Sequence, residues 1–144
     1  MQAEKKPMTK QQYFEKCKKF DNLRNKVASD PYRMKFHLQP PIGWLNDPNG
    51  LCQIGSQYHI YFQYTPFNPN GGTGLWGHMV TEDFIHYEEH EPSIFPDTSW
   101  DANGAYSGSA YEENGEYYFF YTGNVKYEGA EYNYITDGRE QNVI

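Results

Sequence analysis

A repeated hairpin pattern constrains the fold of this chain more than any other feature of its sequence. The segment YHIYFQY, residues 58–64, alternates in two interleaved sets of side chains, which is the period of two expected of a β-strand. A similar run, YYFFYT, begins at Tyr117, 59 residues after Tyr58, and follows the dipeptide Asn114-Gly115. Asn-Gly between two such runs is typical of a tight β-hairpin. The two similar hairpins predict a repeated unit of antiparallel sheet.

Further short apolar runs separated by turn residues complete the predicted all-β fold. We expect strands at residues 51–54, 58–64, 76–80, 85–88, 106–111 and 117–122, with an irregular stretch from 91 to 103. A repeated four-stranded unit suggests the blades of a β-propeller. The 144 residues would then hold one complete blade and part of a second.

The first residues follow a helical pattern instead. Residues 9–29 place Tyr13, Cys17, Phe20, Leu23 and Val27 on one stripe, which predicts a single amphipathic helix on the outside of the body. Thr9 and Gln12 have the spacing of a capping box. Asp30-Pro31 ends the helix, because a residue before proline avoids helical geometry. We therefore divide the chain into a helical extension, residues 1–31, and a partial β-propeller, residues 32–144.

Composition and charge exclude several classes of protein. The chain has 14 Tyr and 3 Trp, which is too aromatic for a disordered segment. Residues 1–35 hold ten Lys and Arg against four acids, whereas residues 36–144 hold two against fifteen. An acidic body repels phosphate backbones, so we expect no nucleic-acid partner. The basic stretch could be a nucleic-acid or membrane arm, but acids interrupt it, and we interpret it as a solvated helix face. No apolar run is long enough to span a membrane.

Cysteine and histidine placement gives no sign of a cofactor. Cys17 and Cys52 are the two cysteines, and they form neither a disulfide framework nor a zinc spacing. The histidines also lack zinc spacing. We expect no metal and no cofactor. The residues after Met1 are polar and contain no signal-peptide core, so we expect a cytoplasmic location.

The segment Gly43-Trp-Leu-Asn-Asp-Pro-Asn-Gly50 holds the most informative polar cluster. Taken alone, its Asn, Asp, Pro and Gly residues are those of a turn, and we interpret residues 46–50 as one. The functional alternative is that Asp47 presents its carboxylate at the entrance of a strand, where a sugar ring could meet it.

Five other segments accompany this one in a fixed order. They are Phe36-His-Leu-Gln-Pro40, Tyr61-Phe-Gln-Tyr64, Trp76-Gly-His78, Tyr106-Ser-Gly-Ser109 and Tyr121-Thr-Gly123. Together they resemble the N-terminal part of glycoside hydrolase family 32, the invertases, sucrose-6-phosphate hydrolases and fructan hydrolases, over about residues 33–144. Another five-bladed glycosidase family fits this combination less well.

The resemblance implies a five-bladed β-propeller followed by a β-sandwich, and hydrolysis of β-fructofuranosides with retention. It implies that Asp47 is the nucleophile and that a fructoside sugar is the substrate. The substrate-binding residues that it implies are Asn46, Gln63, Trp76, Tyr106 and Ser107, of which Trp76 belongs to a motif that is more structural.

Several of these residues also have plainer interpretations. Without the family, Gln63 would more often face solvent on its alternating strand. Trp76 and Trp100 could be packing residues. Ser107 has no base partner in the sequence, so a serine hydrolase is not expected.

Two departures from the family qualify the expected activity. The loop at residues 70–74, Asn-Gly-Gly-Thr-Gly, lacks the Trp that the family usually has there. No Arg-Asp-Pro motif and no Glu-Cys motif, which carries the acid/base, follows. We therefore expect an N-terminal fragment that is inactive alone and that self-associates or docks with the missing blades. The alternative is a non-catalytic carbohydrate-binding or interaction module. With only Lys126 and Arg139 in the body, neutral fructosides are favoured over phosphorylated ones.

Overall fold

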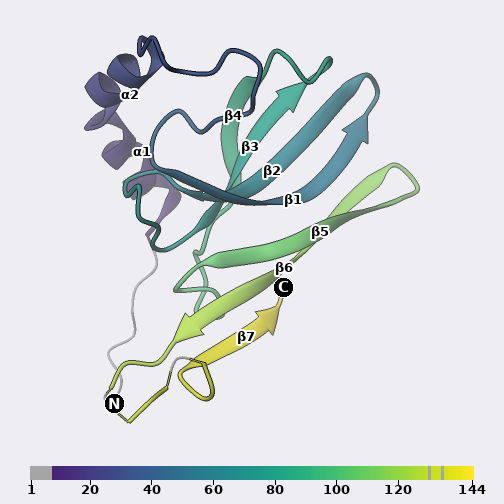
Figure 1. Cartoon of the computed structure of the whole chain (residues 1–144). Coiled ribbons are helices and arrows are strands. Elements are labelled where there is room, and N and C mark those ends of the chain that lie inside the picture. Colours follow the sequence, from purple (N-terminus) through teal and green to yellow (C-terminus); the bar gives the residue numbers. More distant parts are fainter. Residues whose placement is uncertain (1–7, 130, 134) are drawn as a thin grey trace.

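Two β-sheets stacked face to face form the body of the molecule, and two short helices cover the outer side of the first sheet (Figure 1). The structure is a computed structural model that describes residues 8–129, 131–133 and 135–144. Its elements are α1 (Lys10–Lys18), α2 (Asp21–Ala28), β1 (Trp44–Ile54), β2 (Gln57–Thr65), β3 (Leu75–Thr81), β4 (Glu88–Ile94), β5 (Ala105–Glu113), β6 (Glu116–Lys126) and β7 (Arg139–Val143).

Both sheets are antiparallel meanders. The first has the order β1-β2-β3-β4 and the second has the order β5-β6-β7. A four-stranded meander is the unit of a propeller blade, so the first sheet corresponds to a complete blade and the second to part of the next. The predicted all-β class is confirmed, and so is the hairpin at Asn114-Gly115, whose two residues have φ values of 55° and 83° as a type I′ turn requires.

The alternation in β2 directs its side chains to two different cores. Phe62 and Tyr64, each 2% exposed, pack with Tyr13 of α1 on the outer face of the sheet. Tyr61 points the opposite way and packs with the buried Trp76 and with Phe119 of β6. Both faces of the central strands therefore contribute to a hydrophobic core.

The segment expected to be a turn is instead part of a strand. Residues 46–50 lie within β1, and the pairing of β1 with β2 is irregular between Leu45 and Pro48 and again between Asn49 and Cys52. Gly50 has φ 50°, and a Cβ atom there would lie 2.8 Å from the ring of Trp76. The turn-forming residues therefore produce bulges inside a strand.

The helical segment is divided in two, so the prediction of one helix over residues 9–29 was wrong. The N–H groups of Lys19 and Phe20 donate to carbonyl oxygens three residues back, which tightens and ends α1. The break lets the Phe20 ring pack 5.2 Å from that of Phe67, while Leu23 is 45% exposed. The predicted capping box at Thr9 is confirmed. The first seven residues of the extension lie outside the described residues, and its boundary at residue 31 stays a prediction.

The predicted strand at residues 85–88 was wrong, and the first four residues of the stretch 91–103, predicted to be irregular, lie in β4. Residues 85–88 mostly form a turn, because the Asp83 carboxylate accepts hydrogen bonds from the N–H groups of Ile85 and His86, both at 2.8 Å. These bonds hold the pKa of Asp83 well below its usual range. Strand β4 follows instead of an irregular stretch and tolerates Pro92 because it lies at the edge of the sheet. Strand β7 had not been predicted.

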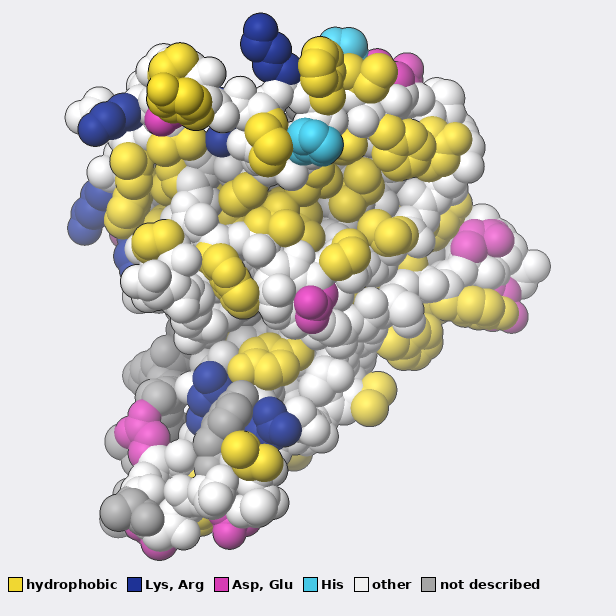
Figure 2. Space-filling model, viewed as in Figure 1, with side chains coloured by type: hydrophobic (Ala, Val, Ile, Leu, Met, Phe, Trp, Pro, Cys, Tyr) yellow, Lys and Arg dark blue, Asp and Glu magenta, His cyan; other side chains and the backbone are white. Residues whose placement is uncertain are grey.

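Basic side chains of the helices pair with acids on β4. Arg24 pairs with Glu89, and Lys10 lies 3.0 Å from Glu91. Figure 2 shows Lys and Arg side chains gathered over the helical part and acids at the tip of the β5–β6 hairpin. These contacts support the interpretation of the basic stretch as a helix face. No described helix is long and apolar enough to cross a membrane.

Three histidines lie on neighbouring strands of the first sheet. The Nδ1 atom of His59 is 3.0 Å from Nε2 of His78, and the His78 ring stacks on Tyr61 and lies 5.1 Å from that of His90. Burial, with the neighbouring His59 and His90, lowers the pKa of His78 to about 4, and burial together with His90 lowers the pKa of His59. Protonation of His78 and of His59 is therefore disfavoured in the folded chain.

We predict that the chain loses stability as the pH falls from about 6.5 towards 4. Below a pH of about 6.5 the unfolded chain binds protons that the folded His78 does not, so the free energy of unfolding should fall by about 1–2 kcal/mol between pH 7 and 5. Urea denaturation at both pH values measures this. His78→Gln should lose most of the dependence, whereas the exposed His37→Gln should keep it. Equal dependence in both variants would contradict the assignment.

Candidate functional site

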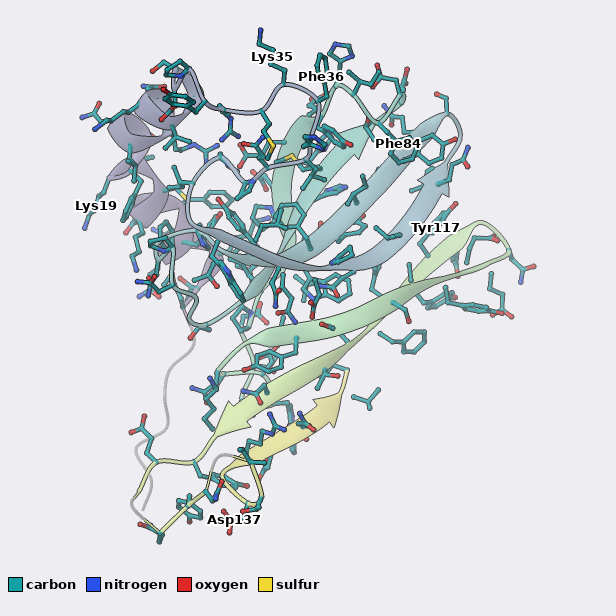
Figure 3. All side chains as sticks on the ribbon, viewed as in Figure 1. Lys19, Lys35, Phe36, Phe84, Tyr117 and Asp137 are labelled. Atoms are coloured by element: carbon teal, nitrogen blue, oxygen red, sulfur yellow. The ribbon has the colours of Figure 1, made fainter. Side chains whose placement is uncertain are left out.

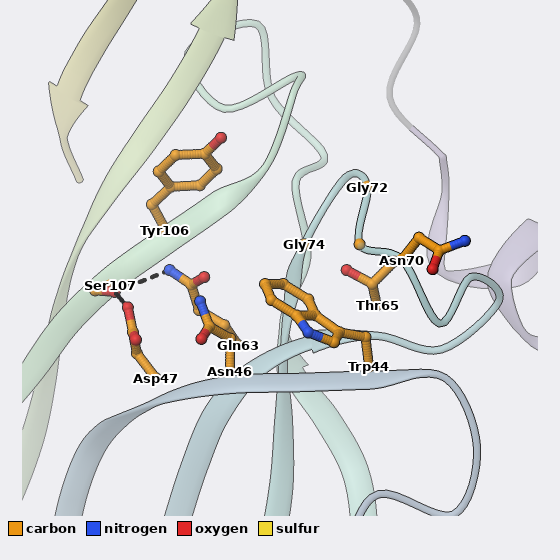
Figure 4. A pocket seen from close by; sticks show the side chains of 11 residues that line it. Trp44, Asn46, Asp47, Gln63, Thr65, Asn70, Gly72, Gly74, Tyr106 and Ser107 are labelled. Atoms are coloured by element: carbon orange, nitrogen blue, oxygen red, sulfur yellow. Dashed lines mark hydrogen bonds between the residues drawn. The ribbon is translucent and has the colours of Figure 1, made fainter.

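A cavity of about 450 Å³ lies where the first strands of the two sheets meet (Figure 4). Its walls come from β1, β2, β5 and the loop between β2 and β3. It is lined by Trp44, Asn46, Asp47, Gln63, Thr65, Asn70, Gly71, Gly72, Gly74, Tyr106 and Ser107. Five of the six predicted site residues, distant in the sequence, therefore meet at one cavity.

A chain of hydrogen bonds crosses the cavity between the sheets. The Ser107 hydroxyl donates to Oδ2 of Asp47 at 2.8 Å, and Nε2 of Gln63 donates to the Ser107 oxygen at 2.8 Å (Figure 4). The serine thus presents its one proton to the carboxylate and its lone pair to the amide. Ser107 thus links the Asp47 carboxylate of β1 to the Gln63 amide of β2.

A β-bulge places the polar pair Asn46 and Asp47 at the cavity. Leu45 pairs with Tyr64 and Pro48 pairs with Phe62, so the two residues between Leu45 and Pro48 stand opposite one residue, Gln63. Such a bulge changes the direction of side chains that a regular ladder would alternate between faces. Asn46 and Asp47, although adjacent, both reach the cavity.

The second sheet is held at this position by several hydrogen bonds. Ala105 N–H donates to Gly74 O at 3.0 Å, and the indole N–H of Trp76 donates to Tyr106 O at 2.9 Å. At the other end of the sheets the Tyr117 hydroxyl donates to Gln53 O at 2.9 Å, where Figure 3 labels Tyr117 between the hairpin and the first sheet. These contacts fix β5 against β1 and bring Ser107 to Asp47.

The structure keeps Trp76 away from the cavity, in contrast to the expected contact with substrate. Its side chain is 0% exposed and packs edge to face with Phe119 and Tyr121 of β6. The full burial of the ring, together with its bond to Tyr106 O, makes it part of the junction between the sheets. Gln63, in contrast, faces the cavity and not bulk solvent.

Trp44 is a cavity residue that the sequence reasoning missed. It is 36% exposed and lines the cavity beside the glycine loop. A Cβ atom at Gly71 would lie 3.8 Å from the Trp44 ring. The loop at residues 70–74, which has no aromatic residue of its own, therefore passes close to the Trp44 indole. The signal was available in the sequence, because Trp44 and Asn46 share one face of a strand by their spacing of two. Trp44 gives the cavity an aromatic wall.

The charge in the cavity is one-sided. Among its lining residues Asp47 is the one carboxylate, and there is no Lys or Arg. Within the described part of the chain no three His, Cys, Asp or Glu side chains are placed to hold a metal ion. The cavity therefore offers one carboxylate among neutral hydrogen-bonding groups and aromatic rings.

Comparison with known proteins gives a consistent family. The family model described as the glycosyl hydrolases family 32 N-terminal domain matches residues 37–143. A sucrose-6-phosphate hydrolase of Bacillus subtilis is 42% identical over 113 residues, which are 78% of this chain and 23% of the relative. An insoluble β-fructofuranosidase isoenzyme of Arabidopsis thaliana is 40% identical over 103 residues, which are 71% of this chain and 18% of the relative.

Solved structures agree with the sequence comparison. The structure of sucrose-6-phosphate hydrolase from Lactobacillus gasseri matches 88% of this chain with a TM-score of 0.73 and 36% identity, and 25% of that chain is covered. Fructan 1-exohydrolase IIa from Cichorium intybus, in complex with 1-kestose, matches 65% of this chain and 18% of its own with a TM-score of 0.61 and 38% identity. The chain spans about a quarter of the length of the sucrose-6-phosphate hydrolases of Bacillus subtilis and Lactobacillus gasseri.

We predict that Trp76→Phe destabilises the junction between the sheets. The change keeps an aromatic ring but removes the indole N–H that donates to Tyr106 O, and loss of such a hydrogen bond should cost about 0.5–1.5 kcal/mol of unfolding free energy. Trp100→Phe is the matched control, because Trp100 is 60% exposed and its replacement should cost less than about 0.5 kcal/mol. Urea denaturation followed by circular dichroism measures both. Equal losses would contradict the structural role of Trp76.

Proposed function

The chain belongs to glycoside hydrolase family 32, and from that membership we propose that it carries the nucleophile and part of the fructosyl pocket of a retaining β-fructofuranosidase. The observation that carries the proposal is the Asp47 carboxylate, hydrogen bonded to Ser107 in a cavity between two sheets. Neutral donors and acceptors surround it, as recognition of sugar hydroxyls requires.

The proposed chemistry begins with attack by an Asp47 oxygen on the anomeric carbon of a fructosyl unit. A bond forms between that oxygen and the anomeric carbon, and the bond from the anomeric carbon to the leaving oxygen breaks. The attacking group is the carboxylate form of Asp47, and the Ser107 hydroxyl, which donates to Oδ2, holds that side chain in place. Water then releases the fructosyl unit and restores the carboxylate.

Asn46, Gln63, Tyr106 and Ser107 are proposed to hold the fructosyl ring. Asn46 and Gln63 offer amide donors and acceptors, whereas Tyr106 supplies an aromatic wall that limits water in the cavity. Trp44, with its ring partly exposed at the cavity, is added to this set. Trp76 supports the pocket from behind through its bond to the backbone of Tyr106.

The leaving oxygen needs a proton, and the cavity offers no second carboxyl group to give it. Retaining glycosidases use two carboxyl groups about 5–5.5 Å apart, and Asp47 is alone among the lining residues. We propose that the acid comes from residues outside this chain. The substrate class proposed is the β-fructofuranosides, to which the names of the sucrose-6-phosphate hydrolase and fructan exohydrolase relatives point.

We predict that a fructosyl donor that needs no acid will label Asp47 covalently. β-D-Fructofuranosyl fluoride is a suitable probe, because fluoride leaves as an anion without a protonated carboxyl group. Mass spectrometry of the intact and digested chain should show one added fructosyl unit on Asp47. Asp47→Asn should abolish the label, and Asp97→Asn, which removes an exposed carboxylate, should not. A label that survives in Asp47→Asn, or none in the unaltered chain, would refute the proposal.

With ordinary substrates we predict no turnover by the 144-residue chain alone. A sugar leaving group that is not protonated leaves slowly, and removal of general acid catalysis typically costs about 10²–10⁴-fold in rate. Release of reducing sugar from sucrose, sucrose 6-phosphate and 1-kestose should stay at the level of a protein-free blank. Turnover by the pure chain that Asp47→Asn abolishes would show that the catalytic pair is complete.

A further inference from the structure

A buried carboxamide lies directly beneath the bulge that presents Asp47. Asn49 is 2% exposed, which places it among the most completely buried side chains described. It follows Asp47 by two residues on β1, and its carboxamide lies between β2 and β5. None of the reasoning on the sugar pocket used this residue.

The hydrogen-bond partners of Asn49 are backbone groups next to the site. In one orientation of the amide, its oxygen accepts from Gln63 N–H at 3.2 Å and its nitrogen donates to Pro48 O at 3.1 Å. In the other, its oxygen accepts from Gly108 N–H at 3.4 Å. The first orientation satisfies both ends of the amide and is the one the network favours. Either way, Asn49 binds the backbone of Gln63 or of the residue after Ser107.

The bulge explains why such a side chain is needed. Gln63 stands opposite both Asn46 and Asp47 and has no single partner on β1, and in the favoured orientation of the Asn49 amide its N–H donates to the Asn49 oxygen. A buried N–H without an acceptor is costly. The Asn49 side-chain oxygen is the acceptor for the Gln63 N–H, and this hydrogen bond links β1 to β2 beside the bulge.

We propose that Asn49 is a positioning residue, which holds the bulge so that Asp47, Gln63 and Ser107 meet in one hydrogen-bonded chain. It does not reach the cavity and acts through the backbone of its neighbours. This proposal rests on the proposed function only in treating Asp47, Gln63 and Ser107 as site residues. The hydrogen bonds among these three side chains can be measured without a sugar.

The test compares Asn49→Ala with Asn103→Ala. Asn103 is 7% exposed, and its side-chain oxygen also accepts from a backbone N–H, that of Lys126 at 2.7 Å. Both variants thus lose one buried amide acceptor, but the partner of Asn103 lies at the far end of β6. If Asn49 were merely structural, both variants would affect the site only through global stability.

Two readouts separate the variants. Amide hydrogen exchange at Gln63 should accelerate in Asn49→Ala by about tenfold beyond the change in global stability, and the side-chain amide signals of Gln63 should move. The rate of Asp47 labelling by fructosyl fluoride should fall by about tenfold. In Asn103→Ala the Gln63 signals should stay in place, and labelling should follow the folded fraction.

The outcomes distinguish this inference from the proposed function. Labelling of the unaltered chain with equal effects of the two variants would overturn the positioning role and leave the function standing. Shifted Gln63 signals without labelling of any chain would overturn the function and leave the positioning role standing. If Asn49→Ala does not fold, Asn49→Ser serves instead, because its hydroxyl is too short to reach Gln63 N–H and should give the same loss of protection.

Discussion

The candidate site depends on a β-bulge, in which two residues of β1 stand opposite one residue of β2. A regular ladder would send Asn46 and Asp47 to opposite faces of the sheet. The bulge opposite Gln63 instead lets both reach one cavity. The residues of the Asn-Asp-Pro-Asn-Gly segment suit this geometry, since proline supplies no N–H to the ladder and Gly50 accepts a positive φ. A sequence that looks like a turn thereby becomes a strand with an irregular, functional centre.

The second constraint is the packing of one sheet on the other. The cavity has walls from both sheets, so the distance from Ser107 to Asp47 depends on where β5 rests on β1. Trp76 is central to this contact, because its ring fills the space between the sheets and its N–H binds the backbone of Tyr106. The ring also lies against Gly50, where no larger residue would fit. The packing of the sheets and the geometry of the cavity are therefore set by the same few residues.

The sequence predicted what local patterns determine and missed what long-range contacts determine. The alternation in residues 58–64 and the Asn114-Gly115 dipeptide gave the hairpins, since period and turn chemistry are local properties. The break at Lys19 and Phe20 depends on the contact of Phe20 with Phe67, and the burial of Trp76 depends on a second sheet 30 residues away. Asn49 was missed because its hydrogen-bond partners are backbone groups. Every residue type has these groups, so the sequence does not show which residues are the partners.

The lining of the cavity carries one carboxylate and no basic group, whereas the proposed reaction needs two carboxyl groups with different roles. A carboxylate that attacks an anomeric carbon and a carboxyl group that protonates the leaving oxygen need opposite environments. The first needs hydrogen-bond donors around it, and Ser107 is such a donor to Asp47 in the described cavity. The second needs burial or a neighbouring negative charge that keeps it protonated at neutral pH. Under the proposed function Asp47 is such a charge, and it would raise the pKa of an acid placed about 5 Å away. On that proposal the nucleophile would also help to keep the acid protonated.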